Sequence, residues 1–211
     1  MSAFDESVQH EDVVRLKLHI EEFREKLGDN INEKLTDHDC ARFLIARKVN
    51  LEKSLEMVKA WYTWYTSPIE GCPDQYSPMD IINYPDKNEH VYTKHMPHSN
   101  LGHALSGSPI YWEKTGLISS RFGDIREDID GDALAIRHIR QQEYMFQKKC
   151  AKASCFYKKN VSKQVIVFNL ADLSYAIDTV ALGVFRKTLV VDEAYYPEVC
   201  LSSNMLVPAS L

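Results

Sequence analysis

Residues 165–170 (VIVFNL) place the strongest constraint on the fold, because they form a short, continuous run rich in β-branched and aromatic side chains. A run that does not alternate apolar with polar residues predicts a strand covered on both faces, as in a mostly parallel sheet with helices on each side. A buried helical turn is the alternative, but the shortness and β-branching of the run favour a strand. We therefore predict that this is the central strand of an α/β sheet.

Three amphipathic helices are predicted ahead of this strand. Apolar residues repeat at spacings of three and four across residues 13–27, and Gly28 is expected to end that helix. Thr36 and Asp39 have the spacing of a capping box for a second helix, and a third is predicted over residues 51–65. This arrangement predicts an all-helical N-terminal lobe.

The proline-rich segment 67–78 cannot continue a helix, so we place a lobe boundary near residue 80. A hairpin is predicted from strands at 96–105 and 110–114, and a long helix is predicted over 129–152. Another helix is predicted after the central strand, over 175–191. Strands separated by helices of this length indicate parallel pairing, so residues 81–211 are expected to form an α/β lobe.

Composition and charge exclude several classes of protein. The net charge of −5 argues against non-specific nucleic-acid binding, and no stretch approaches the ~18 apolar residues of a membrane span. The acidic N-terminus does not resemble a secretory signal, and five cysteines without CxxC spacing indicate reduced thiols. We expect a cytoplasmic protein.

Basic residues are nevertheless concentrated in one segment. Residues 137–163 contain eight Lys or Arg and a single acid, Glu143. This block is either a solvated surface or a patch attracted to anionic lipid headgroups. Arg47 raises a similar question, because it shares the apolar stripe of the second helix and requires either a neighbouring acid or a ligand phosphate as partner.

Common catalytic motifs are absent from the sequence. It contains no phosphate-binding glycine motif, nucleophile elbow or HExxH zinc motif. His95, His98 and His103 are close in sequence, but no cysteine or paired acid accompanies them, and on a strand His95 and His98 would point to opposite faces. The protein is therefore not expected to be an enzyme or to carry a metal or cofactor.

Four segments, taken in order, resemble the CRAL-TRIO lipid-binding family, which includes phosphatidylinositol/phosphatidylcholine transfer proteins. Residues 39–54 resemble the family's helical signature, and 107–114 resemble its hairpin strand. Residues 167–174 are similar to the segment at the end of its central strand, and 195–198 to its Tyr-Tyr-Pro-Glu turn. The resemblance implies an N-terminal all-helical lobe packed on an α/β lobe, whose small mixed, mostly parallel sheet floors an apolar lipid cavity.

The resemblance also implies which residues bind the ligand. Arg47 and Lys48 match positions where phosphatidylinositol-binding members place basic residues near the inositol phosphate, and Glu198 matches an acid on the headgroup side. Tyr111 and Phe168 lie in the two strand motifs and are assigned to the ligand as well. The implied partners are a phospholipid or other hydrophobic ligand and, transiently, a membrane surface, with the protein acting as a monomer.

The sequence departs from the family pattern at several positions. Asn169 replaces the usual aspartate after the central strand, and Ser108 replaces the arginine of the hairpin turn. Gln164 and Ile166 stand where choline-lipid binders carry small hydroxyl residues, which argues against phosphatidylcholine as the ligand.

The family pattern continues well beyond the Tyr-Tyr-Pro-Glu turn, whereas only residues 201–211 remain here. We therefore expect the α/β lobe to be truncated and the edge of the central strand to be poorly covered. The resulting prediction is non-enzymatic binding and transfer of a membrane lipid, phosphatidylinositol in the first place. The alternative is a regulatory or protein-interaction fragment that has lost lipid carriage.

Overall fold

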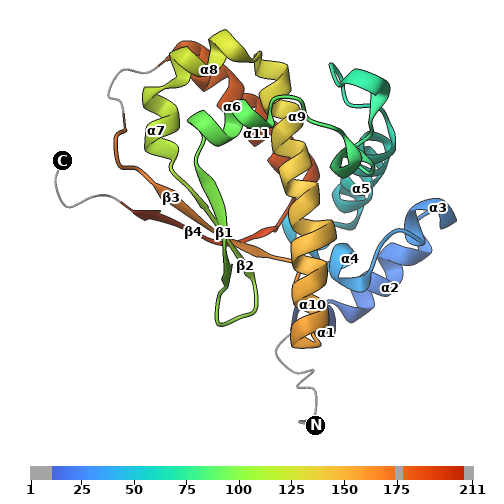
Figure 1. The fold of residues 1–211 in the computed structure, drawn as a ribbon. Coiled ribbons are helices and arrows are strands. Elements are labelled where there is room, and N and C mark those ends of the chain that lie inside the picture. The colour runs from blue at the N-terminus through green and yellow to red at the C-terminus, as the bar shows by residue number, and fades with distance from the viewer. Residues whose placement is uncertain (1–10, 174–177, 207–211) are drawn as a thin grey trace.

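A computed structural model describes residues 11–173 and 178–206 of the chain. Figure 1 shows a small twisted sheet on one side, a group of helices from the N-terminal part on the other, and a long helical column between them. The predicted α/β class with an N-terminal helical lobe is confirmed.

Five helices form the N-terminal region. They are α1 (Glu11–Arg15), α2 (Lys17–Glu25), α3 (Asp29–Asn32), α4 (Asp37–Ala46) and α5 (Leu51–Thr66). The single helix predicted over residues 13–27 was wrong: the backbone leaves helical geometry at Leu16 (φ −101°, ψ 9°), which separates α1 from α2. Gly28 does not end that helix but is the extended residue before α3. The capping box is confirmed, because the Thr36 hydroxyl accepts from the backbone N–H of Asp39 and the Asp39 carboxylate accepts from that of Thr36.

The N-terminal helices share a core of fully buried side chains. Phe23, Phe43, Leu44 and Val58 are all 0% exposed within it. Tyr195 from the C-terminal part of the chain packs against the same core. Full burial of large apolar side chains contributes about 1.5–3 kcal/mol each, so this cluster is the main source of stability for the helical region.

The sheet has four strands in the order β1-β2-β3-β4. They are β1 (His98–His103), β2 (Pro109–Glu113), β3 (Gln164–Asn169) and β4 (Cys200–Leu206). The β1/β2 pair is the predicted antiparallel hairpin, whereas β2/β3 and β3/β4 are parallel. The sheet is therefore mixed and mostly parallel, with the predicted central strand inside it.

The remaining helices link and flank the strands. They are the short 3-10 turns η2 (Pro73–Gln75) and η3 (Ile81–Asn83), then α6 (Glu89–His95), α7 (Thr115–Ser120), α8 (Phe122–Asp128), α9 (Gly131–Tyr144), the π-helical turn η4 (Met145–Cys150), α10 (Ala151–Tyr157) and α11 (Thr179–Tyr195). The consecutive elements α9, η4 and α10 form the column in Figure 1, which corresponds to the predicted long helix.

Side-chain oxygens set the starts of two of these helices. Asp130 Oδ1 accepts from the backbone N–H of Ala133 at the start of α9. Asp178 Oδ1 accepts from Val180 and Ala181, so α11 begins at Thr179. The predicted start at residue 175 lies outside the described residues, which omit 174–177.

The coverage predicted for the central strand was wrong in part. Gln164 and Val165 are buried, but residues 166–169 are only half-buried. Two of the flanking elements lie against the sheet, α7 against β3 and η4 against β2. The carboxyl half of β3 is therefore not enclosed between two layers of helix in the described part of the chain. The division into lobes at residue 80 stays a prediction.

Candidate functional site

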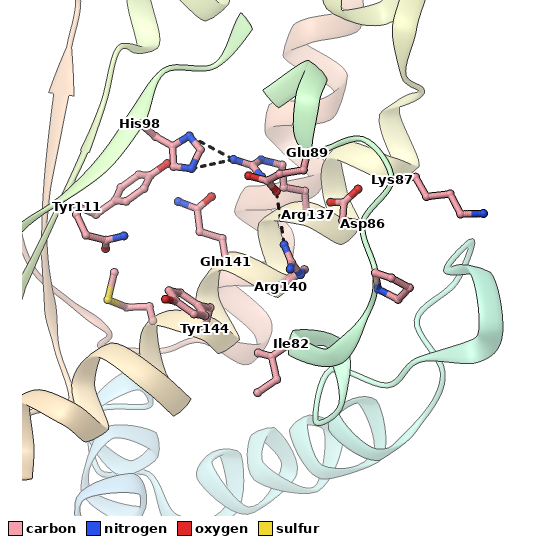
Figure 2. Close-up of a pocket in the computed structure, with 13 residues that line it drawn as sticks. Ile82, Asp86, Lys87, Glu89, His98, Tyr111, Arg137, Arg140, Gln141 and Tyr144 are labelled. Atoms are coloured by element: carbon pink, nitrogen blue, oxygen red, sulfur yellow. Dashed lines mark hydrogen bonds and ion pairs between the residues drawn. The ribbon is translucent and has the colours of Figure 1, made fainter. Parts of the chain in front are cut away.

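A cavity of about 690 Å³ opens between the hairpin, the α9 column and the segment from η3 to α6. Figure 2 shows how side chains from these three parts of the chain meet around it. Its wall is formed by Ile82, Pro85, Asp86, Lys87, Glu89, His98, Asn100, Tyr111, Arg137, Arg140, Gln141, Tyr144 and Met145. The volume is in the range of small-molecule binding sites, which are about 300–1,000 Å³.

Two arginines of α9 dominate the polar side of the cavity. Arg137 and Arg140 are three residues apart, and this spacing puts both on one face of the helix. The Arg137 side chain is only 8% exposed, and its guanidinium lies 3.9 Å from the centre of the Tyr92 ring. Because a cation stacked on an aromatic face is fixed in orientation, Arg137 is held in place before any ligand arrives.

Glu89 of α6 is the carboxylate nearest to both arginines. Its Oε2 atom lies 3.5 Å from Arg137 Nη1 and 3.7 Å from Arg140 Nη1. Both distances exceed the 2.7–2.9 Å of a strong charge-assisted hydrogen bond, and the Glu89 side chain is 55% exposed. Two guanidinium groups therefore share one loosely bound acid.

His98 provides a further contact to Arg137. Its Nδ1 lies 2.8 Å from the Met96 carbonyl oxygen, and its Nε2 lies 3.1 Å from Arg137 Nη2. Arg137 Nη2 also lies 3.3 Å from His98 Nδ1, so both ring nitrogens contact this guanidinium nitrogen. His98 thus holds the guanidinium of Arg137 in place.

Tyr111 is the one predicted site residue that lines this cavity. Its ring is buried, and its hydroxyl donates to Glu113 Oε2 at 2.9 Å. Burial is the main reason that the pKa of Tyr111 lies well above its usual range, and the nearby Glu113 carboxylate raises it further. The side chain is therefore a neutral phenol that contributes ring surface to the cavity wall.

The other four predicted residues lie elsewhere. Arg47 is the C-cap of α4, and Lys48 follows it with a left-handed backbone (φ 52°). Glu198 is exposed in the turn before β4, also with a left-handed backbone (φ 57°), and Phe168 is half-buried in β3. None of the four lines the cavity, and their roles in ligand binding stay predictions.

The salt bridge considered for Arg47 is not formed within residues 11–173 and 178–206. Its Nη1 donates only to the Ala46 carbonyl, at 3.4 Å, and no described carboxylate lies within ion-pair distance. The half-buried guanidinium of Arg47 therefore retains donors for a ligand.

Sequence reasoning missed Arg137, Arg140, Glu89 and His98 as a group. The available signal was the basic block, of which Arg137 and Arg140 are the first two members. That block was expected to be either a solvated surface or a lipid-attracting patch, whereas its first residue is buried and faces the cavity. The acid that meets it is about fifty positions away in sequence, so no local pattern indicates the pairing.

Glu143, for which the sequence suggested no role, belongs to a separate buried network. It accepts hydrogen bonds from Tyr196 at 2.7 Å, Gln147 at 2.9 Å and Tyr65 at 3.5 Å. Burial raises the pKa of Glu143, although these donors act in the opposite direction. The network connects α5, the α9 column and the residue after α11.

Among the described residues, no group of three or more His, Cys, Asp or Glu is arranged to hold a metal ion. His98 lies in the cavity, whereas His103 lies against Tyr157. The helices described in the structure include none with the length and apolar character needed to cross a membrane.

Comparison with known proteins links this architecture to lipid carriers. Three Arabidopsis thaliana proteins, the phosphatidylinositol/phosphatidylcholine transfer proteins SFH7, SFH12 and SFH11, are each 25% identical over 85–86% of the chain. The chain spans 32% of the length of SFH7 and SFH12 and 46% of SFH11. No family model matches the sequence.

The fold also matches a solved structure. A crystal structure of Sfh5 superposes with a TM-score of 0.60, over 99% of this chain and 74% of that one, at 13% identity. At this identity the match concerns the fold alone, and it agrees with the mixed α/β architecture described above.

Proposed function

Because the chain belongs to the CRAL-TRIO family, in the branch of the phosphatidylinositol/phosphatidylcholine transfer proteins, we propose that it binds a membrane phospholipid and transfers it between membranes. The proposed activity is not enzymatic. Transfer needs only that the lipid leaves a bilayer for a protein cavity, which must keep the acyl chains out of water because each exposed CH₂ costs about 0.8 kcal/mol. The protein would act as a cytoplasmic monomer that contacts membranes transiently.

The observation that carries the proposal is the cavity beside the sheet, in a chain related to three lipid transfer proteins over most of its length. Its wall is amphipathic, because Ile82, Tyr144 and Met145 provide apolar surface while Arg137 and Arg140 provide charge. A site with apolar walls and a few convergent polar groups suits a ligand with the same division. A phospholipid has that division.

We further propose that phosphatidylinositol is the preferred lipid. Support comes from the Arg47 guanidinium, which has no carboxylate partner in the described residues and precedes the exposed Lys48. A phosphate on the inositol side would satisfy such donors by charge-assisted hydrogen bonds. Glu198, exposed in its turn, is proposed to accept from inositol hydroxyls.

The test is a transfer assay between vesicles with the purified chain. Arg47→Ala combined with Lys48→Ala should lower phosphatidylinositol transfer about tenfold or more, since hydrogen bonds to charged groups contribute about 1.5–3 kcal/mol each. Transfer of diacylglycerol, which has no phosphate, should change little. A matched control is Lys53→Ala with Lys59→Ala, which removes two exposed cations from α5.

Equal losses for both lipids would mean that Arg47 and Lys48 only maintain the fold. If native mass spectrometry finds no copurifying lipid and no variant transfers any lipid, the carrier proposal fails. That result would favour the alternative of a regulatory or protein-interaction fragment.

A further inference from the structure

The two arginines of the cavity are separate from the residues proposed to bind the lipid headgroup. Arg137 and Arg140 come from α9, whereas Arg47 and Lys48 follow α4 and do not line the cavity. A buried arginine carries a large desolvation penalty unless a strong partner offsets it. The partners of these two residues within the cavity therefore indicate what the site can bind.

Those partners leave the arginines incompletely satisfied. Arg140 Nε is buried without a hydrogen-bond partner, and its Nη1 lies 3.7 Å from Glu89 Oε2. Arg137 has better contacts, to Tyr92 and His98, but shares the same distant carboxylate at 3.5 Å. Native proteins rarely leave buried donors unpaired, so the arrangement points to an absent acceptor.

The charges of the cavity wall favour an anionic acceptor. Lys87, Arg137 and Arg140 face only two carboxylates, Asp86 and Glu89. Asp86 is engaged with the backbone N–H of Asn88, and Figure 2 shows that Lys87 extends away from the arginines. The two guanidinium groups therefore carry more positive charge than Glu89 neutralises.

From this geometry we propose that Arg137 and Arg140 bind the phosphate group of a ligand, and that Glu89 is the internal counter-ion that the phosphate displaces. Two planar guanidinium groups present several donors to one tetrahedral anion, and such forks are the preferred protein partners of phosphate. Glu89 is well placed to leave because its side chain is more than half exposed and its contacts are long. The inference rests on the proposed function where the phosphate belongs to a carried lipid. The single phosphate of phosphatidylinositol would then lie at Arg137 and Arg140, and Arg47 and Lys48 would bind the inositol ring instead.

The same chemistry fits a phospholipid headgroup and inorganic phosphate, so the experiment has two arms. In the first, inorganic phosphate is titrated into the purified chain and its variants by calorimetry. In the second, the same proteins take up phosphatidylinositol or diacylglycerol from vesicles of digalactosyldiacylglycerol, a bilayer lipid without phosphate. Only the first arm is independent of lipid carriage.

The variants are chosen to move affinity in opposite directions. Glu89→Gln removes the competing carboxylate and should strengthen phosphate binding about tenfold, whereas Arg140→Met should weaken it about tenfold. Lys152→Met removes an exposed cation of α10 outside the cavity and should leave binding unchanged. Arg140→Lys keeps the charge without the fork and should fall between Arg140→Met and the original protein.

The two arms separate the possible results. If Arg140→Met lowers phosphatidylinositol uptake but not diacylglycerol uptake, the lipid phosphate occupies the site. If phosphate affinity follows the variants while no lipid is taken up, the site stands as a phosphate site and the carrier function fails. The inference is overturned if Glu89→Gln and Arg140→Met have the same phosphate affinity and lipid uptake as Lys152→Met. Urea unfolding must show in that case that all three variants are folded.

Discussion

At the scale of single residues, Glu143 is a carboxylate in surroundings that disfavour its charge. It is 4% exposed and is held by Tyr196, Gln147 and Tyr65, which come from different parts of the chain. Burial raises the pKa of its carboxyl above the ordinary value of 4.5. Between the ordinary and the raised pKa, the folded protein binds more protons at this site than the unfolded chain does.

The free energy of unfolding should therefore fall as pH rises through this window. The contribution of Glu143 is fully present below about pH 4.5 and is lost as pH passes the raised folded-state pKa. Glu143→Gln removes this titration and can still exchange hydrogen bonds with the tyrosine hydroxyls. Urea unfolding across the pH range should show the variant gaining stability relative to the original protein as pH increases.

Tyr196→Phe is the matched change at the same network. It removes the shortest hydrogen bond to Glu143 and should lower stability at neutral pH by about 1–3 kcal/mol, since it weakens the support of a buried carboxylate. If Glu143→Gln lowers the free energy of unfolding by the same amount at all pH values, burial of the Glu143 charge does not set the pH dependence of stability.

At the scale of secondary-structure elements, the junction between α7 and the end of β3 has no room for a side chain. A Cβ atom added at Gly116 would lie 2.2 Å from the carbonyl oxygen of Ala171 and 2.7 Å from the carbonyl carbon and oxygen of Leu170. All three are backbone atoms, which cannot rotate away. Gly116→Ala should therefore destabilise the protein by about 1–3 kcal/mol, as other overpacked sites do.

Gly123 supplies a control at the equivalent position of the next helix. Both glycines are the second residue of their helices, α7 and α8, but a Cβ at Gly123 would meet nothing within 4 Å. Gly123→Ala should stabilise by roughly 0.5–1 kcal/mol, the usual helical advantage of alanine over glycine. Equal effects in thermal unfolding would contradict the close approach of α7 to β3.

The elements themselves were largely predictable, because their signals are local. The β-branched run gave the central strand, and the spacing of Thr36 and Asp39 gave the start of α4. The break at Leu16 was missed, since the apolar spacing continues past it. At α11 the Asp178 carboxylate accepts from the backbone N–H groups of Val180 and Ala181 and so caps the helix.

The cavity could not be predicted in the same way. Its wall combines residues between 82 and 145, and the pairing of Glu89 with Arg137 and Arg140 depends on how α6 packs beside α9. The resemblance to a lipid-binding family suggested a cavity, and Tyr111, which it assigned to the ligand, is one of the residues that line this cavity. It carried no information about the two arginines, because they belong to none of the four matching segments.

At the scale of the whole molecule, α11 carries an apolar surface that the described part of the chain leaves uncovered. Leu182, Phe185, Leu189 and Val190 are 38–64% exposed, and the helix contains no buried residue. Its opposite side is anchored, because Val184 packs against the core around Tyr92 and Phe122. The two sides of one helix should therefore respond differently to the same substitution.

We expect Phe185→Gln combined with Leu189→Gln to change the free energy of unfolding by no more than about 0.5 kcal/mol per residue, as is usual for exposed positions. The same pair should reduce the fluorescence of a hydrophobic dye such as anilinonaphthalene sulfonate, since it removes exposed apolar area. Val184→Gln, at a contact with the core, should instead destabilise by about 1–3 kcal/mol while leaving the dye signal of the folded protein unchanged. Comparable destabilisation by both sets in urea would show that another part of the molecule covers Phe185 and Leu189.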